Sequence, residues 1–347
     1  MSFHTWRKAY CLGTGAGLLK GSLNNIKDPI NGHDLIKFIN SPKERRKPVV
    51  EGLIYERSVV MFASHPGLGK SILTIQMCLE ISAGLPVFGA FKSYPTKIYY
   101  IQKERPIDEV AERVEEMQKT IPWNPDNFIV DSELQTFSLS NEKNHAWIVE
   151  RIKKHNPGLV IIDPIGAGTP GLSKDEPANI FCNFSTMLQK ETGATNIFNH
   201  HITKDSYDRD GDKIVKDDPF YGSQWIKAHV TGSYLIEEID GGRKFSNKKD
   251  SHTNLISKFD ISYDSERMIS TSKKESMSAL DRAKQYFNAM KTTKQKFTEA
   301  KFRAYLGCAP TTSREIFRTP PFDDKSEIII RHKANGMATL YEVKEFL

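Results

Sequence analysis

The feature that most constrains the fold of this chain is the run Ser64-His65-Pro66-Gly67-Leu68-Gly69-Lys70-Ser71. It follows the pattern GxxxxGK[ST], in which backbone N–H groups wrap phosphates at the positive end of the next helix. The first position is Ser64 instead of glycine, and a small side chain satisfies it. We therefore expect Lys70 to reach the β- and γ-phosphates of ATP, and the Ser71 hydroxyl to hold Mg²⁺.

Both flanks of this run have the pattern that a phosphate-binding loop requires. Residues 58–63 (SVVMFA) form a continuous apolar run, which is typical of a strand buried on both faces. Residues 71–83 have the pattern of an apolar helix that ends at Gly84. A glycine-rich turn that arose by chance would lack this strand and helix, so the flanks favour a nucleotide site.

Strand-like and helix-like segments alternate through the middle of the chain. The strands are expected at 97–102, 159–162 and 195–199, and the helices at 107–117, 146–155 and 179–192. Alternation of this kind predicts parallel strands joined by helical crossovers. From Tyr234, short strands with polar turns would close one edge of the sheet. We therefore predict an α/β core over residues 46–270, a mostly parallel sheet flanked by helices.

Two acidic residues are candidates for the chemistry at the phosphate loop. Asp163 follows the aliphatic strand 159–162, where an aspartate that holds the Mg²⁺ shell is expected beside the loop. Hydrolysis also needs a base that positions water, and Glu104 has the right place at the end of strand 97–102. Two alternatives remain: Glu104 is a surface residue of a first helical turn, or the working carboxylate is Asp175.

The segment 276–347 differs from the core in charge and in pattern. From Lys273 to Leu347 there are 15 Lys and Arg against 9 Asp and Glu, and the rest of the chain has 34 of each. The net charge of +6 therefore lies in residues 273–347. Two helix-like segments, N-cap residues for a third, and two strand-like runs around Asn335-Gly336 follow one another. This is the order of a winged helix.

A basic surface on such a domain suits DNA. Two arginines would lie on one face of the third helix, where they suit contacts in a major groove, and two basic residues of the wing suit the flanking backbone. These candidates are Arg314, Arg318, Arg331 and Lys333. The alternative is a module that only docks another protein, because winged helices share a fold more than a function.

Composition adds little that is specific. Residues 1–45 are polar and are interpreted as an N-terminal arm and linker. No apolar run is long enough to cross a bilayer, and no signal peptide is recognisable. The cysteines are scattered without metal spacing, as expected of reduced thiols in a cytoplasmic protein with no membrane partner; they are Cys11, Cys78, Cys182 and Cys308.

Several motifs together resemble one known family. The residues that carry the resemblance are the arm and P-loop over 46–71, IYYIQKE at 98–104, LVIIDPIGAG at 159–168, NHHITKD at 199–205 and YGSQWIKAHV at 221–230. They resemble the RepA-like hexameric helicases, a branch of the RecA/DnaB/KaiC class of P-loop ATPases (AAA_25-like). The resemblance spans about residues 46–265 and implies a RecA-like fold, with Glu104 as the catalytic glutamate and Asp163 as the Walker B aspartate.

The resemblance also implies roles for further residues. His201 would be the sensor between ATP and the DNA-binding loops. The loop 205–220, whose charge is mixed, would face the central channel of a ring. Lys248 and Lys249 lie where this class supplies a finger to the ATP of the neighbouring subunit.

These expectations lead to three hypotheses about function. The first is a DNA helicase or replication ATPase of a phage or mobile element, active as a homo-oligomeric, hexameric ring with DNA and other replication proteins as partners. The second is an ATP-dependent loader or DNA-binding switch that does not unwind DNA. The third, a nucleotide kinase, is disfavoured because no arginine-rich lid lies between the strands.

Overall fold

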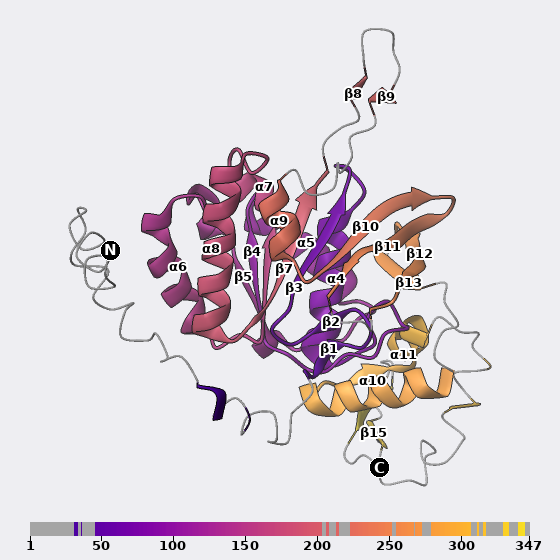
Figure 1. The fold of residues 1–347 in the computed structure, drawn as a ribbon. Coiled ribbons are helices and arrows are strands. Elements are labelled where there is room, and N and C mark those ends of the chain that lie inside the picture. The colour runs from indigo at the N-terminus through magenta and orange to yellow at the C-terminus, as the bar shows by residue number, and fades with distance from the viewer. Residues whose placement is uncertain are drawn as a thin grey trace, which may run out of the picture. The chain divides into compact units, whose positions relative to one another are not determined.

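The computed structural model describes residues 31–33, 36, 46–202, 206–207, 213–214, 223–251, 255–266, 268–272, 279–306, 311, 315–316, 329–332 and 339–343. The chain divides into two compact units, Met1–Arg45 and Arg46–Leu347. All helices and strands labelled in Figure 1 belong to the second unit.

A nine-stranded sheet forms the centre of the second unit (Figure 1). Its strand order is β13-β12-β11-β10-β3-β7-β6-β4-β5. The six strands from β10 to β5 run parallel to one another, and β11, β12 and β13 continue the sheet in antiparallel pairs. The strands are β3 (Val59–Ser64), β4 (Ile98–Gln102), β5 (Phe128–Asp131), β6 (Leu159–Asp163), β7 (Thr195–His201), β10 (Gly232–Ile239), β11 (Gly242–Asp250), β12 (Lys258–Asp264) and β13 (Ile269–Ser272).

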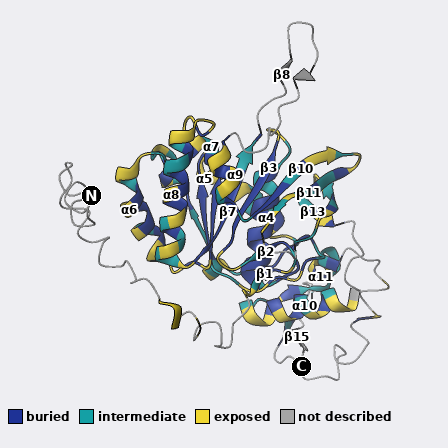
Figure 2. Cartoon of the chain, in the orientation of Figure 1, coloured by how far each residue is buried: buried dark blue, intermediate teal, exposed yellow. Residues whose placement is uncertain are grey.

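Helices cover both faces of the parallel strands. Because side chains alternate along a strand, Val60 and Phe62 of β3 face one apolar cluster, and Val59 and Met61 face another. The first cluster is completed by α4 (Lys70–Ala83) and α5 (Ile107–Met117), and the second by α6 (Glu142–Lys153), α8 (Asp175–Thr192) and α9 (Gln224–His229). Figure 2 shows the central strands β3, β6 and β7 mostly buried, and the helices α6 and α8 with exposed outer sides. The sheet core of the second unit therefore has three layers, with the sheet in the middle.

Short elements connect these layers. They are β1 (Pro48–Val50), β2 (Ile54–Tyr55), the 3-10 turns η2 (Pro125–Asn127) and η3 (Glu133–Thr136), α7 (Ile165–Gly168), β8 (Ser206–Tyr207) and β9 (Lys213–Ile214). Strand β1 pairs with β2, and β8 pairs with β9, both antiparallel.

The segment after the sheet forms its own small cluster. It contains α10 (Ala279–Thr293), β14 (Phe297–Thr298), α11 (Glu299–Leu306), β15 (Ile329–His332) and β16 (Leu340–Val343). The three strands form an antiparallel sheet in the order β14-β16-β15. Its core is rich in aromatic rings, with Tyr286, Phe287 and Phe302 packed together.

The element boundaries differ from the sequence expectations in three places. Helix α6 begins at Glu142 and not near 146, because the Asn141 side chain accepts a hydrogen bond from Lys143 N at 3.2 Å and caps the helix there. Helix α8 begins at Asp175 and not at 179. Strand β7 continues to His201. Within the described residues, no helix combines the length and the apolar character that a membrane span needs.

Candidate functional site

The loop between β3 and α4 carries the run 64–71. Gly67 and Gly69 have φ angles of 86° and 77°, in the left-handed region that favours glycine. A Cβ added to either glycine would meet no atom within 4 Å, so the space over the loop is open. Gly69 is the N-cap of α4 and has no side chain that could accept hydrogen bonds from the first backbone N–H groups of the helix. These N–H groups are therefore available to an anion.

Lys70 lies at the base of this loop and is only 5% exposed. Its Nζ donates to Ser64 Oγ at 2.7 Å and to the Ser64 carbonyl at 3.3 Å, and lies 3.1 Å from His201 Nδ1. Burial lowers the pKa of Lys70 to about 8, although the carboxylates of Asp163 and Glu104 act in the opposite direction. The serine that departs from the usual glycine thus gives this buried ammonium an acceptor.

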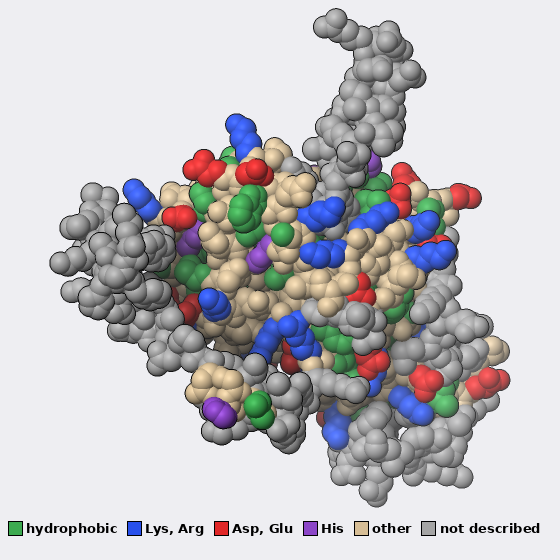
Figure 3. All heavy atoms as spheres, viewed as in Figure 1, with side chains coloured by type: hydrophobic (Ala, Val, Ile, Leu, Met, Phe, Trp, Pro, Cys, Tyr) green, Lys and Arg blue, Asp and Glu red, His purple; other side chains and the backbone are tan. Residues whose placement is uncertain are grey.

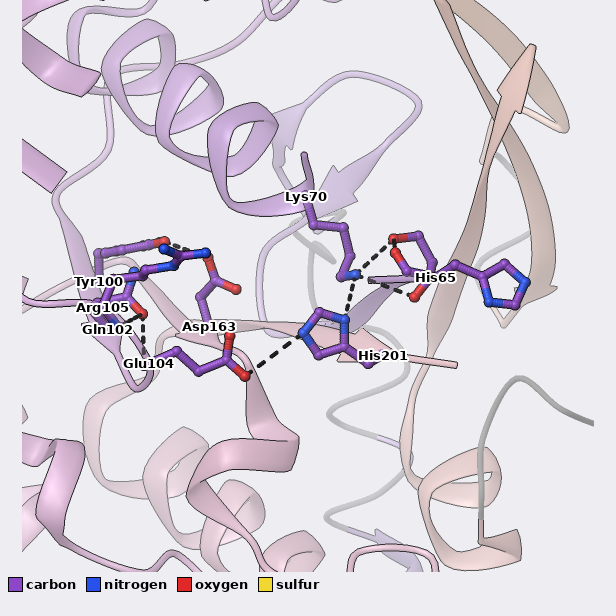
Figure 4. A network of polar contacts seen from close by, with 9 residues as sticks. His65, Lys70, Tyr100, Gln102, Glu104, Arg105, Asp163 and His201 are labelled. Carbon is purple, nitrogen blue, oxygen red and sulfur yellow. Dashed lines mark hydrogen bonds and ion pairs between the residues drawn. The ribbon is translucent and has the colours of Figure 1, made fainter. Parts of the chain in front are cut away.

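The carboxyl ends of four parallel strands meet at this edge of the sheet (Figure 4). In register, Ser64 of β3 pairs with His201 of β7, and Gln102 of β4 pairs with Asp163 of β6. The strand that carries Asp163 is not the direct neighbour of the P-loop strand, because β7 lies between them. The sequence pattern did not indicate this insertion, since alternation gives the order along the chain and not the order in the sheet.

His201 connects the loop to the predicted base. Its Nε2 lies 3.8 Å from Glu104 Oε1, while its Nδ1 faces Lys70. Burial and then the charge of Lys70 lower the pKa of His201. The His201 imidazole therefore lies between the side chains of Lys70 and Glu104, as Figure 4 shows.

The two predicted acids differ in exposure. Asp163 is 1% exposed and accepts a hydrogen bond from the Tyr100 hydroxyl. Glu104 has a half-exposed side chain, and its backbone N donates to Gln102 Oε1 at 3.0 Å. The alternative carboxylate, Asp175, accepts a hydrogen bond from Ser223 Oγ at 3.2 Å instead. Geometry therefore favours Glu104 over Asp175 as the acid that faces the P-loop.

Two contacts at the site were not anticipated from the sequence. Gln102 Oε1 accepts hydrogen bonds from the backbone N–H groups of both Glu104 and Arg105. Arg243 of β11 donates from Nε to the Leu68 carbonyl at 3.1 Å, so the β10–β11 hairpin supports the P-loop from the far half of the sheet. Arg243 and Leu68 are 175 residues apart, and no local signal in the sequence links them.

The predicted basic residues lie away from this cluster or outside the described residues. Lys249 donates from Nζ to the carbonyls of Lys227 and Ala228, at the C-terminal end of α9, and Lys248 is exposed. Lys and Arg side chains gather on the face shown in Figure 3 near the β10–β11 hairpin. Arg331 belongs to β15, while Arg314, Arg318 and Lys333 lie outside the described residues.

A family model described as an AAA domain (AAA_25) matches residues 27–207, more than half of the chain. The chain belongs to the AAA_25 family. A comparison with curated proteins finds no match.

Two solved structures resemble this AAA_25 member. One is an ATPase domain that is 14% identical, with 71% of this chain and 99% of that chain covered at a TM-score of 0.51. A KaiC-like protein, PH0186 from the hyperthermophilic archaeon Pyrococcus horikoshii OT3, is also 14% identical, with 66% and 99% covered at a TM-score of 0.47. The predicted RecA-like fold and P-loop ATPase class are thus confirmed.

The residues of this AAA_25 site fit a nucleotide with Mg²⁺. A buried ammonium of lowered pKa lies below an open loop of backbone amides, which is the environment that phosphate oxygens need. Among the described residues, no group of three or more His, Cys, Asp and Glu side chains is arranged to hold a metal. Magnesium often keeps several waters and binds one or two protein ligands together with phosphates, and Ser71 and Asp163 suit this arrangement.

Proposed function

We propose that this AAA_25 member assembles into a ring and couples ATP hydrolysis to movement on DNA, as a helicase or replication ATPase of a phage or mobile element. The observation that carries the proposal is the line of contacts from Lys70 through His201 to Glu104. His201 is the last residue of β7, and the segment predicted to face DNA, 205–220, follows it closely in sequence. A change of nucleotide at Lys70 is thereby transmitted to the strand end that leads into that segment.

Each residue of the site has one proposed task. Lys70 binds the β- and γ-phosphates, and the Ser71 hydroxyl and Asp163 hold Mg²⁺, which neutralises phosphate charge when it is bound. Glu104 orients the attacking water and takes its proton as the bond from the γ-phosphorus to ADP breaks. His201 senses whether the γ-phosphate is present, because it contacts both Lys70 and Glu104.

The ring and the DNA contacts are proposed from residues outside this line of contacts. Lys248 or Lys249 of one subunit reaches the ATP of the next. Residues 276–347 form a winged helix that binds DNA through Arg314, Arg318, Arg331 and Lys333. The order α10, β14, α11, β15, β16 and the net positive charge of this segment support that proposal.

A strand-displacement assay tests the helicase. Purified protein with ATP and Mg²⁺ is expected to separate a labelled forked duplex, and Glu104→Gln protein is expected to leave it paired. Electron microscopy of the same sample with single-stranded DNA is expected to show rings. The proposal of unwinding would be contradicted if the protein hydrolysed ATP but separated no strands, whether the fork carries a 5′ or a 3′ single-stranded tail.

One observation favours a second candidate, a DNA loader or switch without unwinding activity. The segment 205–220 contains six Asp and three Lys or Arg. This excess of negative charge disfavours binding to a phosphate backbone. The switch predicts that DNA binding depends on the nucleotide, while forks stay paired. Titration of labelled duplex in ATP and in ADP distinguishes the two candidates.

A further inference from the structure

Lys103 lies directly before the proposed base, and its side chain contacts the backbone of residues 134–137. It is only 5% exposed. Its backbone N donates to the Asp163 carbonyl at 2.8 Å, which ties the end of β4 to the end of β6. The residue thus stands between the proposed catalytic glutamate and the Walker B strand.

The side chain of Lys103 is held by three carbonyl oxygens of residues 133–137, which comprise η3 and the residue after it and are called the η3 segment below. Its Nζ donates to the carbonyls of Leu134, Gln135 (3.2 Å) and Phe137 (2.7 Å). An ammonium has three donors, so these contacts engage all of them. Burial lowers the pKa of Lys103 to about 8, and the charge of Asp131 offsets this only in part.

The stem of Lys103 also contacts the segment that follows Asp163. A Cβ added at Gly168 of α7 would lie 3.0 Å from Lys103 Cε. The Gly168 carbonyl accepts a hydrogen bond from Leu139 N at 2.7 Å. Lys103 therefore joins the end of β4, the η3 segment and α7.

Burial of an ammonium costs free energy even when carbonyls satisfy its donors, and an apolar side chain would fill the same space without that cost. Buried charges of this kind are concentrated at functional sites. Gln102 fixes the same turn from the other side, because its Oε1 accepts from Glu104 N and Arg105 N. The peptide that carries Glu104 is thus anchored on both sides.

We propose that Lys103 is a positioning residue for Glu104: its ammonium, bound to the η3 carbonyls, fixes the backbone that aims the Glu104 carboxylate at the attacking water. The inference rests on the proposed function of Glu104 as the base. It assigns Lys103 no contact with ATP, so Lys103 acts on the rate of hydrolysis and not on the affinity for nucleotide.

The test is Lys103→Met in the full chain, which keeps the stem and removes the donors. The kcat of ATP hydrolysis is expected to fall about tenfold to a hundredfold, because small errors in the placement of a catalytic group have costs of this size. The affinity for a fluorescent non-hydrolysable ATP analogue is expected to stay within about threefold. Lys143→Met, at an exposed position of α6, is the matched control and is expected to match the wild type. A wild-type kcat, or an equal loss of affinity, overturns the proposal.

A double variant separates this proposal from the role of Glu104. If Lys103 acts through Glu104, adding Lys103→Met to Glu104→Gln lowers kcat by less than about twofold further. Independent, multiplying losses overturn the positioning role. Normal turnover in Glu104→Gln alone refutes the proposed base, whereas a slow Glu104→Gln beside a normal Lys103→Met refutes only the inference about Lys103.

A second site gives a test that does not depend on folding of Lys103→Met. Gly168→Ala crowds both the Lys103 stem and the Leu139 side chain, because the added Cβ would lie 3.0 Å from Lys103 Cε and from Leu139 Cδ1, while Gly166→Ala in the same helix meets no atom within 4 Å. Gly168→Ala is expected to lower kcat several-fold at unchanged nucleotide affinity, and Gly166→Ala to have no effect. Equal kcat in the two variants contradicts the proposal.

Discussion

The ATPase core and the C-terminal segment bury different kinds of side chain. In the core, Lys70, Lys103 and Asp163 are at most 5% exposed. In the described part of residues 279–343, every buried side chain is apolar or aromatic. The core therefore keeps charges out of water, at a cost in free energy, at the edge of the sheet where chemistry is proposed. In the described part of the C-terminal segment, no Lys, Arg, Asp or Glu side chain belongs to the buried core.

This difference separates two kinds of behaviour. Buried charges interact in a medium of low dielectric and respond to pH and to single substitutions. Surface charges are screened by salt. Substitution and pH should therefore act mainly on ATP chemistry through the core, and salt mainly on partner binding through the C-terminal segment.

The largest effect is expected from Lys70→Ala. Removal of the one buried ammonium that touches the P-loop Ser64 leaves developing phosphate charge uncompensated. Turnover is expected to fall by at least about a hundredfold, with weaker nucleotide binding. The turnover is measured as phosphate release by the purified, folded variant. Full activity would contradict the proposal that the buried charge of Lys70 is needed for hydrolysis.

The next effect is a pH dependence of ATP affinity. The pKa of Lys70 is about 8 without nucleotide, and bound phosphates would raise it, so binding takes up a proton above that pH. The affinity for ATP is therefore highest below about pH 8 and falls by up to tenfold per pH unit above it. The phosphates are already fully ionised in that range, so they do not contribute to the change. Equilibrium titrations from pH 7 to 9.5 on protein shown to be folded check this, and a flat profile would contradict it.

A smaller effect is expected in the C-terminal segment, and it should depend on salt. Arg314→Ala with Arg318→Ala is expected to weaken duplex binding about tenfold at low salt and to reduce the salt slope by about two. Hydrolysis in the absence of DNA should stay unchanged. Unaltered binding at every salt concentration would instead favour a docking module, and the contrast between the two regions would then rest on the core alone.

The smallest effect distinguishes two neighbouring lysines of β11. Lys249 holds the last carbonyls of α9, so Lys249→Ala is expected to cost about 1 kcal/mol of stability and to lower Tm by about 2 °C. Lys248 is exposed, and Lys248→Ala should leave Tm unchanged. Equal shifts in thermal unfolding would show that the Lys249 contact carries no stability.

Local sequence patterns predicted those parts of the site that lie within one short segment of the chain. Ser64–Ser71, the buried strand before it and Asp163 each have a signal within a few residues. Strand β5 was missed because it has only four residues at the sheet edge, where burial leaves a weak pattern. Strand β14 has two residues and was missed for the same reason.

Contacts between distant segments had no such signal. Lys103 meets carbonyls 31 to 34 residues away, and Arg243 meets Leu68 across 175 residues. The place of β7 between β3 and β6 is likewise a property of the sheet and not of any one strand. The winged helix and its DNA contacts stay predictions.

The most direct test of the account is to identify the nucleotide held by Glu104→Gln protein after incubation with ATP and Mg²⁺. The amide keeps the shape of the side chain and loses the base, and hydrolysis is expected to slow on the order of a hundredfold. Asp175→Asn, whose parent carboxylate accepts from Ser223, is the control. The account predicts that Glu104→Gln retains ATP while wild type and Asp175→Asn hold ADP. ADP formed at the wild-type rate in Glu104→Gln, with ATP retained by Asp175→Asn, would show that Asp175 and not Glu104 is the base.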